Sequence, residues 1–329
     1  TLLQRIHVLT VQANNGTMDN TSLKAIATEV RARAGELLQI ANRQDGNGEY
    51  LYAGFSTTTQ PFSHNGVAAS YSGDQGVRQL QISATQKIAD GFNGERVFMD
   101  IPAGNGRFVA SAGVHAGTGV LGTTQVVDPV AWSAAAAAAA AVPQPHSYTI
   151  RFADGDTDGV ADSWEVLDAG GNQVATGSYD GQGAISFNGA QVNISGKPAD
   201  GDTFTVEPAG TEDIFRTVDQ LLASLEQGAD TPESRARLGT DLNKAMGQLA
   251  RAMDHVDNLR AETGARIAAL DTAAIQREDL DYELTASLSA LRDLDYAEAI
   301  SRLNQQVVGL QAAQTAYTRI GQMSLFDIL

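Results

Sequence analysis

The sequence predicts an α+β fold, with a long-helix rod domain built from both chain ends and an inserted β-rich outer domain. Of the 33 glycines and 8 prolines in the 329-residue chain, 25 glycines and 7 prolines lie between residues 46 and 211. Alternating apolar patterns gather in that middle, whereas residues 1–45 and 212–329 show helical periodicity. Helices that bracket a β-rich middle indicate that the chain ends pack together around an insertion.

We therefore expect four segments. Residues 1–97 form N-terminal helices and a β-hairpin of the rod, and residues 98–211 form the inserted domain. Residues 212–290 form the C-terminal helices of the rod, and residues 291–329 form a last helix. If helical throughout, that last segment would be about 60 Å long.

The N-terminal segment predicts two helices. Apolar residues from Leu2 to Ala13 share one face, and Asn14, Asn15 and Gly16 end the pattern. A second helix is expected to start near Asp19, whose side-chain oxygen suits a cap, and to run to about residue 41.

The C-terminal segments carry the longest helical pattern. After a short helix that Gly228 closes, Thr231 and Pro232 indicate a new start. From Leu242 to Ala274 the apolar steps alternate between four and three residues, the rhythm of a coiled coil. A later run supplies the candidate assembly residues: Leu291, Ile300, Leu303, Val307, Leu310, Tyr317 and Ile320. These residues fit either an ordinary amphipathic bundle helix or a helix that binds another subunit.

The middle segment predicts strands around one helix. Alternation between apolar and polar residues indicates strands near residues 79–82, 148–152, 185–187, 191–194 and 203–206. Asp128 and Pro129 suit a helix start, and the eight alanines from Ala134 to Ala141 continue that helix until Pro143.

Composition excludes several classes of function. The chain has 22 Lys and Arg against 39 Asp and Glu, a net charge of −17, so we expect neither nucleic acid nor an anionic membrane as a partner. No cysteine is present, which rules out disulfides, thiolate zinc sites and cysteine nucleophiles. The sequence begins without Met and with a helical pattern already running, so we expect a natural N-terminal segment to precede Thr1.

Several motifs resemble the flagellin-type family. Residues 48–57 (GEYLYAGFST), followed by Pro61 and Phe62, are similar to the stretch where a long helix of that family turns into the hairpin of its rod domain. Residues 293–300 (DLDYAEAI) resemble the family's C-terminal signature. Residues 310–320 and the ending 324–329 (SLFDIL) are similar to its hook-associated, hook–filament junction subfamily. The resemblance covers residues 1–97 and 207–329.

The resemblance implies a structural adaptor that joins the flagellar hook to the filament. The terminal helices would form the inner core of a tube, with residues 291–329 packed against the preceding N-terminal segment, and the insertion would point outward. Implied partners are other copies of the chain in a ring, a neighbouring hook-associated protein, flagellin, and an export chaperone on the C-terminal helix. Secretion by type III export to an extracellular flagellum is also implied.

One local motif has the spacing of a calcium loop. Aspartates at 154, 156 and 158 are followed by Gly159, and a glutamate stands at the twelfth position. Such a loop would bind calcium through oxygens of Asp154, Asp156, Asp158, Val160, Asp162 and Glu165. Because the flanking residues alternate like strands, a solvated acidic turn remains the alternative.

Two other functions stay open beside the junction adaptor. Flagellin, the filament subunit, belongs to the same class, and a calcium-dependent binding or adhesive module would rest on residues 154–165 alone. An enzyme is not expected, because the five histidines stand far apart without metal-binding or catalytic spacing. Apart from calcium, we expect no cofactor.

Overall fold

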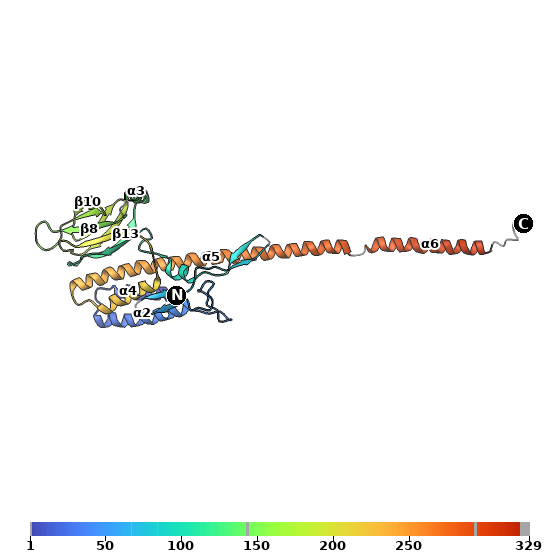
Figure 1. Ribbon diagram of the computed structural model, residues 1–329, viewed down its shortest axis with the longest axis horizontal. Coiled ribbons are helices and arrows are strands. Elements are labelled where there is room, and N and C mark those ends of the chain that lie inside the picture. Colours follow the sequence, from blue (N-terminus) through green and yellow to red (C-terminus); the bar gives the residue numbers. More distant parts are fainter. Residues whose placement is uncertain (1, 67, 84, 143–144, 293–294, 323–329) are drawn as a thin grey trace. The chain divides into compact units, whose positions relative to one another are not determined.

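A computed structural model describes residues 2–66, 68–83, 85–142, 145–292 and 295–322. The chain forms two compact units, Thr1–Arg266 and Ile267–Leu329. The first contains helices of both chain ends and the inserted strands, so the fold is of the α+β class that the sequence predicts (Figure 1). Among the described residues, no helix combines the length and apolarity needed to cross a membrane.

The rod helices of the first unit are α1 (Leu2–Ala13), α2 (Asn20–Ala41), α4 (Ile214–Gln227) and the start of α5 (Pro232–Arg292). Asp19 caps α2 by accepting a hydrogen bond from the Ser22 amide at 2.8 Å, as the sequence predicts. Apolar stripes of all four helices meet in one core, to which Leu23, Leu221 and Leu249 contribute. Helices from the two ends of the chain therefore fold together, with α2 beside α4.

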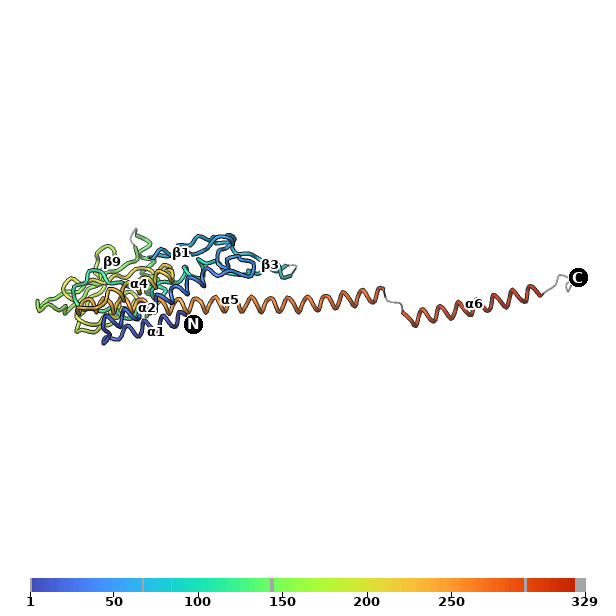
Figure 2. The backbone as a smooth tube through the Cα atoms, turned by 90° about the horizontal axis from the view of Figure 1, so that it is seen from below, coloured from blue at the N-terminus to red at the C-terminus, as the bar shows by residue number. Residues whose placement is uncertain are grey.

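Two short hairpins and a π-helix follow α2. The hairpins pair β1 (Phe62–His64) with β2 (Ala69–Tyr71) and β3 (Gln79–Gln81) with β4 (Lys87–Ala89) (Figure 2). The π-helix η1 spans Glu95–Met99. Phe62 is fully buried, and its ring lies 5.2 Å from that of Phe215 in α4 and 5.3 Å from that of Phe98. Aromatic packing thus fixes the first hairpin to the rod core.

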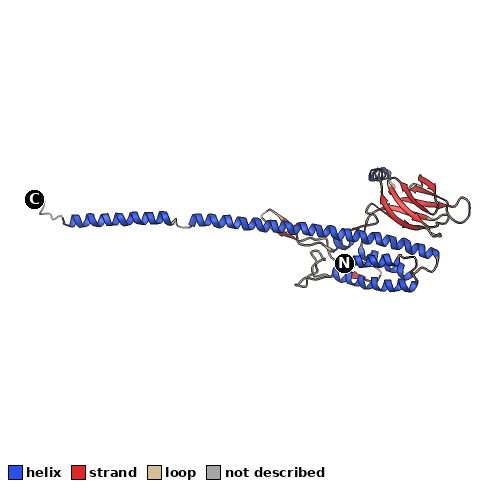
Figure 3. Ribbon diagram, turned by 180° about the vertical axis from the view of Figure 1, so that it is seen from behind, coloured by secondary structure: helices blue, strands red, loops and turns tan. Residues whose placement is uncertain are grey.

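The insert contains two antiparallel sheets and helix α3 (Pro129–Ala140) (Figure 3). The five-stranded sheet has the order β10 (Gln173–Ser178), β9 (Ser163–Asp168), β8 (Tyr148–Ala153), β13 (Thr203–Pro208) and β6 (Phe108–Ala112). The three-stranded sheet has the order β11 (Gln182–Phe187), β12 (Ala190–Ser195) and β7 (Val120–Val126). Both sheets and Trp132 of α3 share one apolar core. Four of the five predicted strands lie in the insert as β8, β11, β12 and β13, and the fifth is β3 of the second hairpin.

A short ribbon connects the insert with the rod. Strand β5 (Ile101–Pro102) enters the insert and pairs antiparallel with β14 (Thr211–Glu212), which leaves it. The amide of Ala103 donates to the carbonyl of Gly210 at 3.0 Å and extends this pairing. We call the paired strands β5 and β14 the neck.

The second unit, from Ile267 onward, contains the end of α5 and helix α6 (Tyr296–Gln322). The sequence predicted a single helix over 291–329, whereas α6 begins at Tyr296 and Leu291 belongs to α5. Asp295 explains the new start, because its carboxylate accepts hydrogen bonds from the amides of Ala297 and Glu298 at 2.9 and 3.1 Å. The motif parts at 293–294 and 324–329 lie outside the described residues.

Candidate assembly interface

Helix α6 presents a row of large apolar side chains to solvent. Ile300, Leu303, Val307 and Leu310 follow one another at steps of three and four, and Tyr317 and Ile320 continue the row. We call these six residues the α6 seam. Their exposed fractions range from 44% at Val307 to 79% at Tyr317, and no described residue of α6 is buried. An exposed apolar row of this kind is a candidate surface for binding another protein.

The spacing of the α6 seam is that of a coiled-coil face. Fully burying one such side chain yields about 1.5–3 kcal/mol, so six of them supply on the order of 10 kcal/mol before the costs of association. Polar contacts of α6 lie elsewhere on the helix; Arg302, for example, pairs with Glu298 one turn earlier at 2.6 Å. The helix can therefore fold with its polar side satisfied and its apolar side available to a partner.

The predicted assembly residue Leu291 does not lie on α6. It occupies the last turn of α5 and is 87% exposed. Two further exposed leucines, Leu284 and Leu288, precede it on the same helix, and Tyr296 stands four residues before Ile300. These three residues were not among the predicted site residues, although their three- and four-residue spacing is the signal that identifies the seam itself.

The acidic motif forms the loop of the hairpin between β8 and β9. Oxygens of Asp154, Asp156 and Asp158 lie within 4.8 Å of one another, a grouping that could hold a metal ion. The Asp154 carboxylate accepts hydrogen bonds from the amides of Gly159 and Thr157 at 2.8 and 2.7 Å. The bond from Gly159 is the largest of the effects that lower the pKa of Asp154.

The loop also concentrates negative charge. The Asp158 amide lowers the pKa of Asp156, but a hydrogen bond with Asp154 and the charges of Asp158 and Asp154 outweigh it, so the pKa of Asp156 is raised. A cation would relieve the same repulsion.

The other predicted calcium ligands have different surroundings. Glu165 lies on β9 opposite Arg151 of β8, with which it forms an ion pair. The Asp162 carboxylate accepts a hydrogen bond from the Gly155 amide at 3.2 Å, and the amide of Val160 donates to Asp158 at 2.8 Å. The structure thus brings together three of the six predicted residues, in a strand–loop–strand hairpin. Calcium binding stays a prediction.

Comparison with known proteins relates both chain ends to one class. Residues 1–57 match the family model of the bacterial flagellin N-terminal helical region, and residues 246–329 match that of the bacterial flagellin C-terminal helical region. The paired terminal helices and the exposed α6 seam are thus those of a flagellin-type protein, the class that the sequence motifs indicate.

Relatives over the whole chain define the family more narrowly. The crystal structure of FlgL from Xanthomonas campestris is 31% identical, with 88% of this chain and 89% of that chain covered and a TM-score of 0.75. The flagellar junction protein FlgL from Legionella pneumophila is 29% identical, and the match covers 82% of this chain and 87% of that chain with a TM-score of 0.72. Flagellar hook-associated protein 3 of Escherichia coli is 22% identical over all of this chain and 73% of its own length. The chain belongs to the flagellar hook-associated protein 3 (FlgL) family.

Proposed function

We propose that this protein is the structural adaptor that joins the flagellar hook to the filament. Its relatives are structural proteins of the flagellum rather than enzymes, and one of them is a flagellar junction protein. The observation that carries the proposal is the α6 seam, six exposed apolar side chains at coiled-coil spacing. Such a helix is built to bind other helices.

The proposed mechanism is assembly by helix packing. The α6 seam packs against helices of the same and of neighbouring subunits, and the copies close into a ring. One side of the ring contacts another hook-associated protein and the opposite side contacts flagellin. The acidic insert, with its own core, remains outside these helix contacts.

The same seam requires protection before assembly. An apolar helix face exposed in a cell favours aggregation, so we infer that an export chaperone covers α6 until the protein leaves through the type III export apparatus. The protein then acts outside the cell, as part of the extracellular flagellum.

Substitution of one seam residue tests the proposal. Leu303→Asp places a charge at the centre of the α6 seam, where burial of an unpaired carboxylate is strongly unfavourable. We expect the variant to be exported but not incorporated, so that flagellin is shed into the medium. Gln305→Asp, on the other side of the same helix, is the matched control and should assemble normally. Normal filaments on the Leu303→Asp strain would refute the role of the seam.

The alternative that the protein is flagellin itself has less support. Two relatives that cover most of the chain are a flagellar junction protein from Legionella pneumophila and flagellar hook-associated protein 3 of Escherichia coli. The alternative of a calcium-dependent binding or adhesive module rests on the three clustered aspartates alone. Calorimetric titration with calcium tests it separately.

A further inference from the structure

The insert and the rod have separate apolar cores, and polar side chains of α5 connect them. Leu242 and Leu249 of α5 belong to the rod core, whereas the insert core contains Phe108 and Phe204. Four other residues of α5 donate or accept hydrogen bonds with backbone groups of the insert and the neck. They are Arg237, Thr240, Asn243 and Gln248, which we call the α5 polar row.

The middle of the α5 polar row binds the edge of β7. The amide of Leu121 donates to the Thr240 hydroxyl at 3.0 Å, and the Asn243 side-chain amide donates to the Leu121 carbonyl at 2.9 Å. Strand β7 is an outer strand of its sheet, so these two side chains supply the partner that a neighbouring strand would provide. Asn14 donates to the Asn243 side-chain oxygen at 3.0 Å, which directs the amide nitrogen toward Leu121.

One end of the row binds the neck. The amide of Gly104 donates to the Gln248 side-chain oxygen at 3.1 Å, and the Gln248 nitrogen donates to the Pro102 carbonyl at 3.4 Å. Gln248 is only 3% exposed. Since a buried amide left without partners is costly, this glutamine favours the docked arrangement of the neck.

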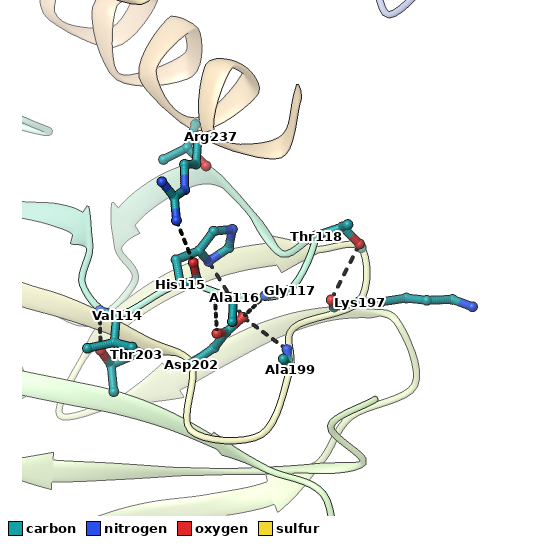
Figure 4. Close-up of polar contacts among 12 residues, drawn as sticks. Val114, His115, Ala116, Gly117, Thr118, Lys197, Ala199, Asp202, Thr203 and Arg237 are labelled. Atoms are coloured by element: carbon teal, nitrogen blue, oxygen red, sulfur yellow. Dashed lines mark hydrogen bonds and ion pairs between the residues drawn. The ribbon is translucent and has the colours of Figure 1, made fainter. Parts of the chain in front are cut away.

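The other end of the row binds the loop before β7. Arg237 donates to the His115 carbonyl at 2.8 Å (Figure 4). The buried Asp202 carboxylate shapes this loop by accepting hydrogen bonds from the amides of Ala116, Gly117 and Ala199 at 2.6, 3.0 and 2.9 Å. The loop is thereby held in the conformation that presents the His115 carbonyl to the helix (Figure 4).

Together these contacts attach the insert at two places, and the neck at a third, along one helix. Eleven residues separate Arg237 from Gln248, which corresponds to about 16 Å of helix. Attachment at both ends and in the middle of such a span opposes rotation about the neck. We propose that the α5 polar row fixes the orientation of the insert on the rod helices, by binding insert backbone rather than insert side chains. The neck alone does not set this orientation.

A distance measurement between the two cores tests the proposal. The chain has no native cysteine, so Ala32→Cys on α2 and Ala134→Cys on α3 provide two unique sites for spin labels, both exposed. Pulsed electron paramagnetic resonance then reports the distribution of label-to-label distances. We expect a single narrow distribution in the doubly labelled protein. A broad distribution there would overturn the proposal at once.

The decisive comparison replaces the three members of the α5 polar row that bind the insert and keeps Gln248, which binds the neck. Arg237→Met, Thr240→Val and Asn243→Leu together should broaden the distribution or add a second distance. The matched control, Arg251→Met with Asn258→Leu, changes exposed polar residues of the same helix and should leave the distribution narrow. An unchanged narrow distribution in the triple variant would show that the neck sets the orientation.

Two further measurements separate loss of orientation from loss of folding. Both tryptophans, Trp132 and Trp164, lie in the insert, so their fluorescence reports its core, while circular dichroism reports the rod helices. Both signals should remain native in the triple variant. If that variant does not fold, Gln248→Leu alone becomes the test, with a smaller broadening expected and an unchanged width again refuting the proposal.

Discussion

Substitution of Asp202 by asparagine should destabilise the insert without affecting the rod. The Asp202 side chain is fully buried, and its carboxylate accepts three backbone hydrogen bonds, two of them at Oδ2. Asparagine has almost the same shape but replaces one acceptor oxygen by a donor NH2 group. Whichever way the amide is placed, at least one backbone N–H therefore faces another donor.

The expected loss is about 3–5 kcal/mol. One buried N–H left without an acceptor costs about 1–3 kcal/mol. The other two hydrogen bonds then have a neutral acceptor in place of a charged one. Because hydrogen bonds to charged groups are stronger than neutral ones, each of the two loses about 1 kcal/mol. For a domain of this size, the sum corresponds to a fall in Tm of more than about 10 °C.

Tryptophan fluorescence measures the effect on the insert alone, since both tryptophans lie there. Asp200→Asn is the matched control, because Asp200 is exposed and its carboxylate accepts one hydrogen bond among the described residues, from the Asp154 amide at 3.2 Å. We expect urea unfolding followed by fluorescence to show a large loss for Asp202→Asn and little change for Asp200→Asn. Equal, small losses for both variants would refute the role assigned to the Asp202 carboxylate.

Three further predictions follow from the structure. Burial lowers the pKa of His115, against a smaller opposing effect of the Asp202 charge, so the folded protein should lose stability as pH falls below about 6.5, the pKa of an unfolded histidine. Urea unfolding between pH 7 and 5 should therefore depend less on pH in His115→Gln than in the wild type. If the acidic loop binds calcium, a free calcium concentration of about a hundred times the Kd should stabilise the protein by about 2.7 kcal/mol, and magnesium should stabilise it less. Calorimetric titration of chelator-treated protein with calcium should then release heat, and Asp154→Asn with Glu165→Gln should abolish that heat. If millimolar calcium gives no heat in the wild type, the loop is an ordinary acidic turn. Amide hydrogen exchange in the isolated monomer should be faster after Ile300 than in residues 242–259, and equal protection would contradict an unpartnered α6.

Local sequence patterns were sufficient to predict the main elements. Three- and four-residue apolar steps located the long helices. Alternation located five strands, namely β3, β8, β11, β12 and β13, but not β6, β7 and β10 of the insert. Helix starts were readable because capping depends on neighbouring residues: Asp128 accepts hydrogen bonds from the amides of Val130 and Ala131, directly before the predicted proline start. The α6 seam was readable for the same reason, since its signal is spacing along one helix.

Contacts that depend on the tertiary fold could not be predicted in this way. Thr240 binds Leu121 across 119 residues, and its partner is a backbone group that carries no sequence signal. Glu165 fits the calcium pattern by spacing, but the register of β8 and β9 places it opposite Arg151. The π-helix at Glu95–Met99 likewise has no periodic signature over five residues.

The neck has a consequence for the order in which the chain folds. Helix α4 must return to the π-helix η1, whose Phe98 packs against Phe215 of α4, across about 110 intervening residues. Closing a flexible loop of that length costs roughly 4 kcal/mol in entropy. Once the insert has folded, the pairing of Pro102 with Thr211 brings its two ends together. The remaining closure resembles that of a loop of a few residues, at about 1 kcal/mol. Early folding of the insert therefore removes about 3 kcal/mol from the entropic barrier to joining the two halves of the rod, which favours rapid folding of the chain.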